Sequence, residues 1–295
     1  MTMADIAINV GAEHSEGPIW DVETQRLWWV DISGEKVHRF DPLTGTDVEF
    51  AIDGQPGAVA VRDSGGAVVA VPDGFALLDP DADGGTGRVT PWIAVESDKP
   101  ENRMNDCKCD PLGRFWAGTM AYEWRKYPTN GALYVLGTDH SVRRLFDGAG
   151  ISNGLGWSPD TTSFYYVDSV KNTLDVFDCD LAAAVVTNRR TIVEIEPAFV
   201  GDGLTVDAEG NVWVAFGRSG SVHCYSPAGE LQAMVEVPVT ITTSCTFGGS
   251  DLGDLYITTS WFDLPDDKKQ VEDVAGAVFV CRPGVSGLAP HRYRG

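Results

Sequence analysis

The sequence predicts an all-β chain that folds as a six-bladed β-propeller with four antiparallel strands in each blade. Three observations support this prediction. One segment pattern recurs six times along the 295 residues, at intervals of roughly 40 to 50 residues. Each copy contains short runs rich in β-branched and aromatic residues. The 33 glycines and 16 prolines suit the many tight turns that such short strands need.

The clearest copy of the repeat runs from Gly203 to Val237. There, GLTVDA predicts a first strand, EGN a turn and VWVAFG a second strand, and RSG and PAGE then introduce the strands SVHCYS and LQAMVEV. A sandwich would not keep one register over six copies, and no linker divides the chain. We therefore expect a single domain over residues 1–295. The six copies begin at Gly17, Gly57, Cys107, Gly154, Gly203 and Cys245.

The ends of the chain suggest how the ring closes. After GAVFVCRP the sixth copy has only a short tail with glycine and proline, so it lacks a fourth strand. The apolar run Ile6 to Val10 stands before the first copy and has no assigned partner. Because an unpaired strand edge can pair with another chain, we expect residues 6–10 to complete the last blade. A frayed N-terminus is the alternative.

Composition and charge narrow the function classes. The formal net charge of −21 disfavours nucleic acid and anionic membranes as partners, and it suits a neutral substrate, a cation or simply solubility. No run of 18 apolar residues predicts a membrane span. The first residues lack the basic and apolar regions of a secretory signal, so we expect a cytoplasmic protein. The six cysteines lack the spacing of a zinc site and are expected to be free thiols.

One column of polar residues predicts a metal site. In a propeller the first strand of each blade lines the central channel, so the residues just before these strands converge at one end of it. Carboxylate and carboxamide oxygens in this column are hard ligands, suited to Ca²⁺, Mg²⁺ or Mn²⁺. Carboxylates held close together also repel unless a cation neutralises them or one takes a proton. Hydrogen bonding to turns would explain one such residue better than four in phase. The column consists of Glu16, Pro56, Asp106, Asn153, Asp202 and Ser244.

Two long loops are expected at the same end of the channel. They are residues 119–131 and residues 260–276, each of which joins a second strand to a third. Glu123, Trp124, Arg125 and Tyr127 on the first loop are placed to reach a substrate. The second loop is expected to cover part of the pocket.

Four motifs resemble those of the gluconolactonase/regucalcin (senescence marker protein) family: SEGPIW, NRMNDCKCDPLGRFWAGTM, ISNGLGWSPD and GDGLTVDAEGNVWVA. They occur in order between about Glu13 and Ser260. The resemblance implies a six-bladed propeller with one divalent cation held by Glu16, Asn153 and Asp202, which leaves Asp106 outside the ligand set.

The same resemblance implies three substrate-binding residues: Arg103 and Asn105 match the family's Arg-x-Asn, and Glu123 matches the acidic residue after GTM. The chain departs from the family at Tyr122-Glu123, where a small residue and an acid often stand, and this difference would reshape the pocket.

The activity that the resemblance implies is divalent-metal-dependent hydrolysis of a sugar lactone to the sugar acid. The substrate would be an aldonolactone such as gluconolactone, or a related hexono- or pentonolactone. The metal would polarise the carbonyl group and lower the pKa of a bound water, and Asp202 is expected to act as general base. Ca²⁺ is the first candidate for the metal, ahead of Zn²⁺, Mg²⁺, Mn²⁺ and Fe²⁺.

Other readings of the site stay open. A covalent route is disfavoured because no G-x-S-x-G motif is present. None of the five histidines falls in the polar column, but His14 lies two residues from Glu16 and is a rival base. The alternative functions are a calcium-binding regulatory propeller of the regucalcin type and a phosphotriesterase-like hydrolase.

Overall fold

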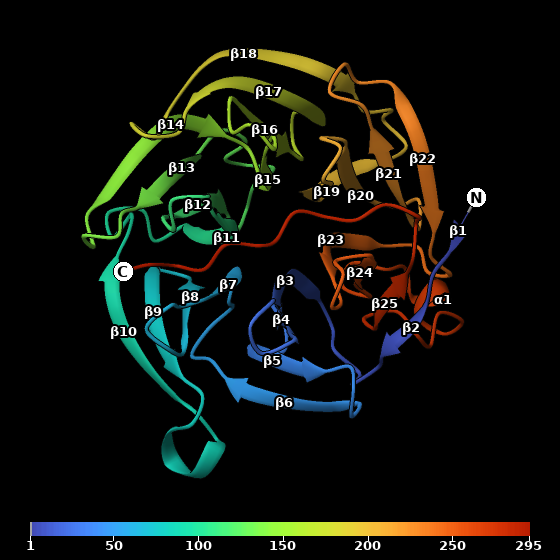
Figure 1. The fold of residues 1–295 in the computed structure, drawn as a ribbon, viewed down its shortest axis with the longest axis horizontal. Helices are drawn as coiled ribbons and strands as arrows, with labels where there is room; N and C mark the ends of the chain where they lie inside the picture. The colour runs from blue at the N-terminus through green and yellow to red at the C-terminus, as the bar shows by residue number, and fades with distance from the viewer. Residues whose placement is uncertain (1) are drawn as a thin grey trace.

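The computed structural model describes residues 2–295 and places six β-sheets as blades around a central channel (Figure 1). In five of the blades four consecutive strands pair antiparallel, with the first strand nearest the centre of the ring and the last at its outside, whereas the sixth blade combines three consecutive strands with one from the N-terminal segment. The predicted six-bladed propeller with four antiparallel strands per blade is confirmed.

Three blades come from the N-terminal half of the chain. The strands of the first are β3 (Ser15–Asp21), β4 (Arg26–Asp31), β5 (Lys36–Asp41) and β6 (Thr46–Ala51). Those of the second are β7 (Ala58–Val61), β8 (Ala67–Val71), β9 (Gly74–Asp79) and β10 (Arg88–Ala94). Those of the third are β11 (Asn102–Cys109), β12 (Phe115–Ala121), β13 (Gly131–Leu136) and β14 (Val142–Ala149).

The remaining blades follow in order around the ring. The strands of the fourth are β15 (Ser152–Trp157), β16 (Ser163–Asp168), β17 (Thr173–Asp180) and β18 (Val185–Glu194). Those of the fifth are β19 (Val200–Val206), β20 (Val212–Gly217), β21 (Ser221–Tyr225) and β22 (Leu231–Glu236). The sixth contains β23 (Thr242–Gly248), β24 (Asp254–Thr259) and β25 (Val278–Cys281).

The N-terminal segment contributes to two blades. Strand β2 (Asp5–Ile8) pairs antiparallel with β25 and supplies the fourth strand of the sixth blade. Strand β1 (Thr2–Met3) pairs parallel with β22 at the outer edge of the fifth blade. The first and last segments of the chain therefore share one sheet.

The hydrophobic core lies between neighbouring blades. Side chains alternate along each strand, so both faces of a blade are covered by its neighbours. On β12, Phe115 packs in a cluster with Phe75 of the second blade, whereas the adjacent Trp116 packs with Trp157 and Phe164 of the fourth. This explains why the second strands are buried along almost their whole length.

In the third and fifth blades a buried aspartate directly follows the first strand and binds a tryptophan of the second strand. Asp110 accepts a hydrogen bond from the indole Nε1 of Trp116 at 2.8 Å, and Asp207 accepts one from Trp213 at 2.9 Å. Each also accepts backbone N–H bonds from its own turn. The aspartate thereby fixes the turn and the second strand together.

The C-terminal tail crosses the end of the channel opposite the polar column (Figure 1). The backbone N–H of Tyr293 donates to Val61 O at 2.9 Å, and its hydroxyl donates to Gly137 O at 2.8 Å. A cavity of about 270 Å³ lies beneath the tail, between Leu288 and Trp157. The channel is therefore open to ligands mainly at its other mouth.

Helical structure in residues 2–295 is confined to the short segments η1 (Ala82–Gly85) and α1 (Asp266–Lys269). No helix of these residues is long and apolar enough to cross a membrane. All six cysteines are free, and five of them are buried.

Candidate functional site

The polar column lies inside the first strands rather than before them. Five of these strands begin earlier than the sequence pattern predicts, so Glu16, Asn153 and Asp202 belong to β3, β15 and β19. Only Pro56 precedes its strand. The pattern was misread because polar residues and glycines usually indicate turns, whereas here the backbone pairing continues through them.

A β-bulge accompanies each of the three predicted metal ligands. The register shifts between Glu16 and Ile19, between Ser152 and Leu155, and between Gly201 and Leu204. A bulge interrupts the alternation of side chains and re-aims the residue at its centre. The glycine after each ligand fits this arrangement: a Cβ atom at Gly154 would stand 2.7 Å from the carbonyl oxygen of Asp202.

The structure brings Glu16, Asn153 and Asp202 together at the mouth of the channel. Glu16 and Asn153 are buried, and Asp202 is half-buried. Burial, together with the negative charge of Asp106, raises the pKa of Asp202 to about 8, although hydrogen bonds with Glu16 and Asn153 act in the opposite direction. Burial and the repulsion from Asp202 also hold the pKa of Glu16 well above its ordinary value. The two carboxylates therefore repel one another unless a proton or a cation separates them.

A hydrogen bond from its nitrogen fixes the orientation of the Asn153 carboxamide. Nδ2 donates to Ser169 Oγ at 3.0 Å, and that hydroxyl donates to Gly201 O at 2.6 Å. The other end of the amide, Oδ1, is buried and has no hydrogen-bond partner. Because an unpaired buried oxygen is costly, an amide oxygen left without a partner in a residue that shares a cavity with Glu16 and Asp202 fits a ligand for a cation.

The donor set fits a hard divalent cation. No group of three His, Cys, Asp or Glu side chains in residues 2–295 is placed to hold a metal ion. The site instead offers two carboxylates and one carboxamide, and oxygens of these types are the ligands that Ca²⁺ prefers. Soft ligands for zinc are missing from this set.

A cavity of about 420 Å³ opens in front of these oxygens. Arg103 and Asn105 line it, as the sequence predicts. The guanidinium Nη1 of Arg103 donates to Met104 O and to Asn105 Oδ1, both at 2.8 Å, and Asn105 Nδ2 donates to Ser152 O at 2.9 Å. Both side chains are thus held by the third and fourth blades, and their remaining polar atoms are available to a substrate.

Glu123 is not among the cavity residues. Its side chain is 69% exposed and lies 3.5 Å from the ammonium of Lys126. The preceding residue, Tyr122, lines the cavity in its place, beside Arg103. Trp124 and Arg125 of the same loop also reach the wall, but Tyr127 does not. A motif match cannot decide which of two adjacent loop residues faces inward.

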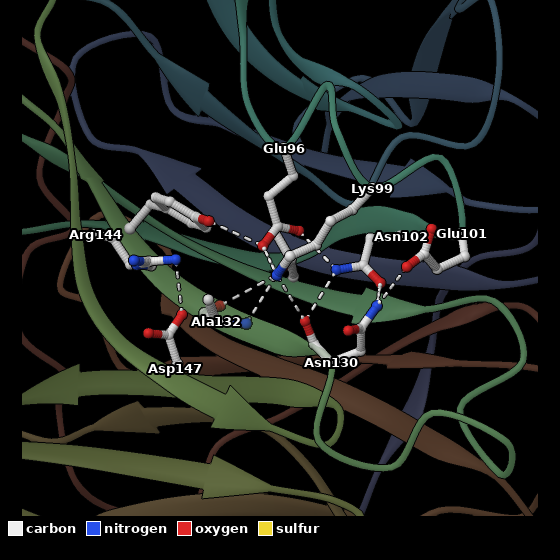
Figure 2. A network of polar contacts seen from close by, with 10 residues as sticks. Glu96, Lys99, Glu101, Asn102, Asn130, Ala132, Arg144 and Asp147 are labelled. Atoms are coloured by element: carbon white, nitrogen blue, oxygen red, sulfur yellow. Dashed lines mark hydrogen bonds and ion pairs between the residues drawn. The ribbon is translucent and has the colours of Figure 1, made fainter.

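The base of this loop is fixed by a network of polar contacts (Figure 2). Asn130 Nδ2 donates to Glu101 Oε1 at 3.0 Å and to Asn102 Oδ1 at 2.8 Å. Lys99 Nζ donates to the carbonyl oxygen of Asn130 at 3.2 Å and to Glu96 Oε1 at 2.9 Å. The segment before β11 therefore holds the end of the loop that returns to β13.

The wall also contains His14, which the sequence marks as a rival base, and Arg218, which the sequence prediction missed. His14 stacks on Phe262 of the second long loop, with ring centroids 5.5 Å apart. Burial and the positive charge of Arg103 lower the pKa of His14 to about 4, so its imidazole is neutral at physiological pH. Arg218 reaches the cavity from the turn between β20 and β21. The turn RSG follows a second strand, as the two long loops do. This position in the repeat therefore indicates that Arg218 lies at the same end of the channel as the site.

Lys108 lines the channel on the side away from the site. Its buried ammonium donates to Leu204 O at 2.5 Å, and the negative charge of Asp106 nearby partly offsets the fall in pKa that burial causes. The carboxylate of Asp106 thus interacts with the ammonium group of Lys108.

Comparison with known proteins identifies relatives that span the whole chain. A family model described as the SMP-30/Gluconolactonase/LRE-like region matches residues 14–261. Regucalcin of Xenopus laevis is 38% identical over 286 residues, which cover 95% of this chain and 94% of that protein. A luciferin-regenerating enzyme superposes with a TM-score of 0.91 at 30% identity, covering 100% of both chains. A regucalcin from Agrobacterium tumefaciens, described as a calcium-binding protein, superposes with a TM-score of 0.92 at 28% identity, covering 100% of this chain and 98% of that one.

Proposed function

This chain belongs to the SMP-30/gluconolactonase/LRE-like family, and on that premise we propose that it hydrolyses a small sugar lactone to the sugar acid with one divalent metal ion. Family membership supports a lactonase-type role. The observation that carries the proposal is the buried cluster of Glu16, Asn153 and Asp202, in which the amide oxygen of Asn153 lacks a partner. The substrate we propose is an aldonolactone such as gluconolactone, or a related hexono- or pentonolactone.

Glu16, Asn153 and Asp202 would hold the metal. A bound divalent cation supplies a Lewis acid for the ester carbonyl and neutralises the carboxylates. Ca²⁺ is our first candidate because the donor atoms are all oxygens and a relative is described as calcium-binding. Zn²⁺, Mg²⁺, Mn²⁺ and Fe²⁺ are the other candidates.

Asp202 is the proposed general base. It is half-buried at the cavity, so its carboxylate can accept a proton from a water molecule that attacks the lactone carbonyl. The ring C–O bond then breaks, and the leaving oxygen takes up a proton to give the hydroxy acid. His14 is a weaker candidate, because an imidazole with a pKa of about 4 gives little driving force at neutral pH.

Arg103 and Asn105 are the proposed substrate-binding residues. Each is buried and held by backbone carbonyl groups, so each can hold the sugar hydroxyls without first being ordered. In the conformation of the loop described above, Tyr122 takes the place that the family resemblance assigned to Glu123.

The first experiment is a panel of sugar lactones with the metal-stripped protein, reconstituted with one metal at a time. We expect turnover of at least one aldonolactone that depends on the added metal. If the reconstituted protein hydrolyses an organophosphate and no sugar lactone, the proposal is wrong and the phosphotriesterase-like alternative is supported.

The second experiment is Asp202→Asn. Loss of a general base costs about 10²-fold or more in kcat. Calcium binding by calorimetry, measured alongside, separates the base from the ligand role. Full activity with normal metal affinity would contradict the base assignment. The matched control is Asp160→Asn, an exposed aspartate in the turn between β15 and β16.

A regulatory calcium-binding propeller is the second candidate function, because the relative from Agrobacterium tumefaciens is described as calcium-binding. It predicts calcium affinity at the same three residues without turnover of any lactone in the panel. The two measurements above therefore distinguish the candidates.

A further inference from the structure

The cavity in front of the proposed metal ligands gathers three arginines on a strongly acidic chain. The formal net charge is −21, yet Arg103, Arg125 and Arg218 all line this one cavity. Apart from the proposed ligands Glu16 and Asp202, whose charge a divalent cation would neutralise, the acidic residue in the wall is Asp263. The wall that meets the distal part of a substrate therefore carries an excess of guanidinium groups.

None of these arginines is paired with a carboxylate within 4.0 Å among residues 2–295. Arginines outside the cavity more often have such a partner: Arg282 pairs with Asp251 and Asp254, and Arg88 pairs with Asp83. Arg39, Arg62 and Arg143 also lack one in the described part of the chain, so the distinguishing feature is that three unpaired arginines gather at one cavity. Acidic residues outnumber basic ones by 43 to 22, so partners are plentiful. Unpaired arginines gathered at one cavity are consistent with partners that come from a ligand.

Arg125 is held ready for a ligand by its own loop. Its guanidinium carbon lies 4.3 Å from the centroid of the Trp124 ring, and stacking of this kind orients the plane of the group. The loop is in turn fixed at its base through Asn130, as Figure 2 shows. Arg125 thus forms part of the rim without using its hydrogen-bond donors on the protein.

Arg218 reaches the rim from the fifth blade, in the turn between β20 and β21. Its backbone adopts a left-handed conformation, with φ of +72°, which non-glycine residues rarely adopt. The adjacent turn residue Ser219 is bonded to Phe216 O and Ser221 Oγ, so the turn is fixed in place. Eleven other non-glycine residues among residues 2–295 also have a positive φ, so this conformation reflects the tight turn that positions Arg218 at the rim.

We infer that the substrate is an anionic sugar lactone, with a carboxylate or phosphate group remote from the lactone carbonyl, and that Arg125 and Arg218 bind this group. Guanidinium groups bind carboxylates and phosphates through paired N–H donors. The inference rests on the proposed lactonase function and names the substrate class of the same site. The anionic group takes no part in the reaction: water adds to the lactone carbonyl, the ring C–O bond breaks, and the product carries one further negative charge.

The test compares lactones that differ in charge, with the metal-loaded protein at about pH 7. The matched pair is glucarolactone and its methyl ester, which share one carbon skeleton, and 6-phosphogluconolactone distinguishes phosphate from carboxylate. We expect kcat/KM to be at least about tenfold higher for a charged lactone than for the ester. Raising the ionic strength from about 0.01 M to about 0.15 M should reduce this advantage.

The variant Arg125→Gln/Arg218→Gln should reduce the ratio of kcat/KM for the charged lactone over the ester by about tenfold, mainly through KM. The control is Arg282→Gln, an exposed arginine outside the cavity, which should leave the ratio unchanged. Equal kcat/KM for glucarolactone, its ester and 6-phosphogluconolactone, or a ratio unaffected by the double variant, would overturn the inference and leave the lactonase function standing.

Failure of the lactonase function itself gives a different result, since no lactone of either charge would be hydrolysed. Calorimetric binding of glucarate and gluconate then decides the inference separately. If glucarate, the dianion, binds more tightly than gluconate and the Arg125→Gln/Arg218→Gln variant loses this difference, an anion site is supported. Equal affinities in the wild type exclude it.

Discussion

At the scale of single residues, the proposed metal ligands are held in an arrangement that is unfavourable without a cation. Glu16 is buried and Asp202 half-buried beside it, and loss of solvent is the largest cause of the raised pKa of each. Neither charge is balanced by a basic side chain within 4.0 Å in residues 2–295. Folding therefore maintains a repulsion that a proton or a metal ion relieves, and the two should compete for the site.

This competition predicts a pH dependence for the metal-free protein. The folded Asp202 keeps its proton up to about pH 8, whereas an unfolded aspartate releases it near 3.8. Between these values the folded state binds more protons, so stability should fall as the pH rises from about 4 to about 8. Melting temperatures of the chelator-treated protein across this range measure the effect. Saturating Ca²⁺ and the Asp202→Asn variant should each flatten the slope, and an unchanged slope in both would contradict this account.

His14 gives a second prediction at this scale. Its imidazole is neutral above about pH 4 and stacks on Phe262, so its role is to form part of the wall. The variant His14→Phe should therefore keep the shape of the pH–rate profile between about pH 5 and pH 8. Loss of one limb of the profile, with a fall in kcat of about 10²-fold or more, would make His14 the base instead of Asp202.

At the scale of elements, the hairpin between the first and second strands depends on its buried aspartate. Asp207 is fully buried and accepts bonds from the backbone N–H groups of Glu209 and Asn211 and from Trp213 Nε1. The variant Asp207→Ala leaves these donors unsatisfied and should cost about 2–4 kcal/mol in urea denaturation. The control is Asp160→Ala in the corresponding exposed turn of the fourth blade, where a cost below about 1 kcal/mol is expected.

The loop of residues 122–130 is the second element with a testable role. The variant Asn130→Ala removes the bonds that tie the loop to Glu101 and Asn102 (Figure 2). A loop freed at its base must be ordered on substrate binding, so KM should rise by about fivefold, equivalent to about 1 kcal/mol. Thr129→Ala, at the exposed neighbouring position, is the control. An unchanged KM in steady-state kinetics would show that the hydrogen bonds of Asn130 do not affect substrate binding.

The elements also show which parts of the site could be predicted from sequence. The alternation of apolar residues gives the blades, and their order places Glu16, Asn153 and Asp202 at one mouth of the channel. The bulges do not follow from the alternation, because they depend on pairing between two strands. The inward position of Tyr122 depends on bonds between the loop and the segment before β11, and the stacking of His14 on Phe262 joins residues far apart in the chain. Contacts of this range leave no local signal.

At the scale of the whole molecule, the two ends of the chain complete the ring in different ways. The C-terminal tail crosses the far end of the channel, and the N-terminal segment adds β2 to the sixth blade and β1 to the fifth (Figure 1). The first strand of every blade lines the channel, so loosening between the sixth and first blades would change the spacing between Glu16 on β3 and Asp202 on β19. We therefore expect ring closure and the geometry of the site to be coupled.

Removal of residues 1–8 tests this coupling. The truncation deletes both N-terminal strands and exposes the edge of β25, which then offers unpaired backbone groups to another chain. We expect a lower melting temperature, association that grows with protein concentration in light scattering, and weaker calcium binding. The matched control removes residues 1–3 and deletes β1 alone, so β2 still covers β25 and the protein should stay close to the full-length chain in all three measurements. Equal behaviour of the two truncations would mean that β2 does not close the ring, and a loss of stability without a loss of calcium affinity would separate ring closure from the site.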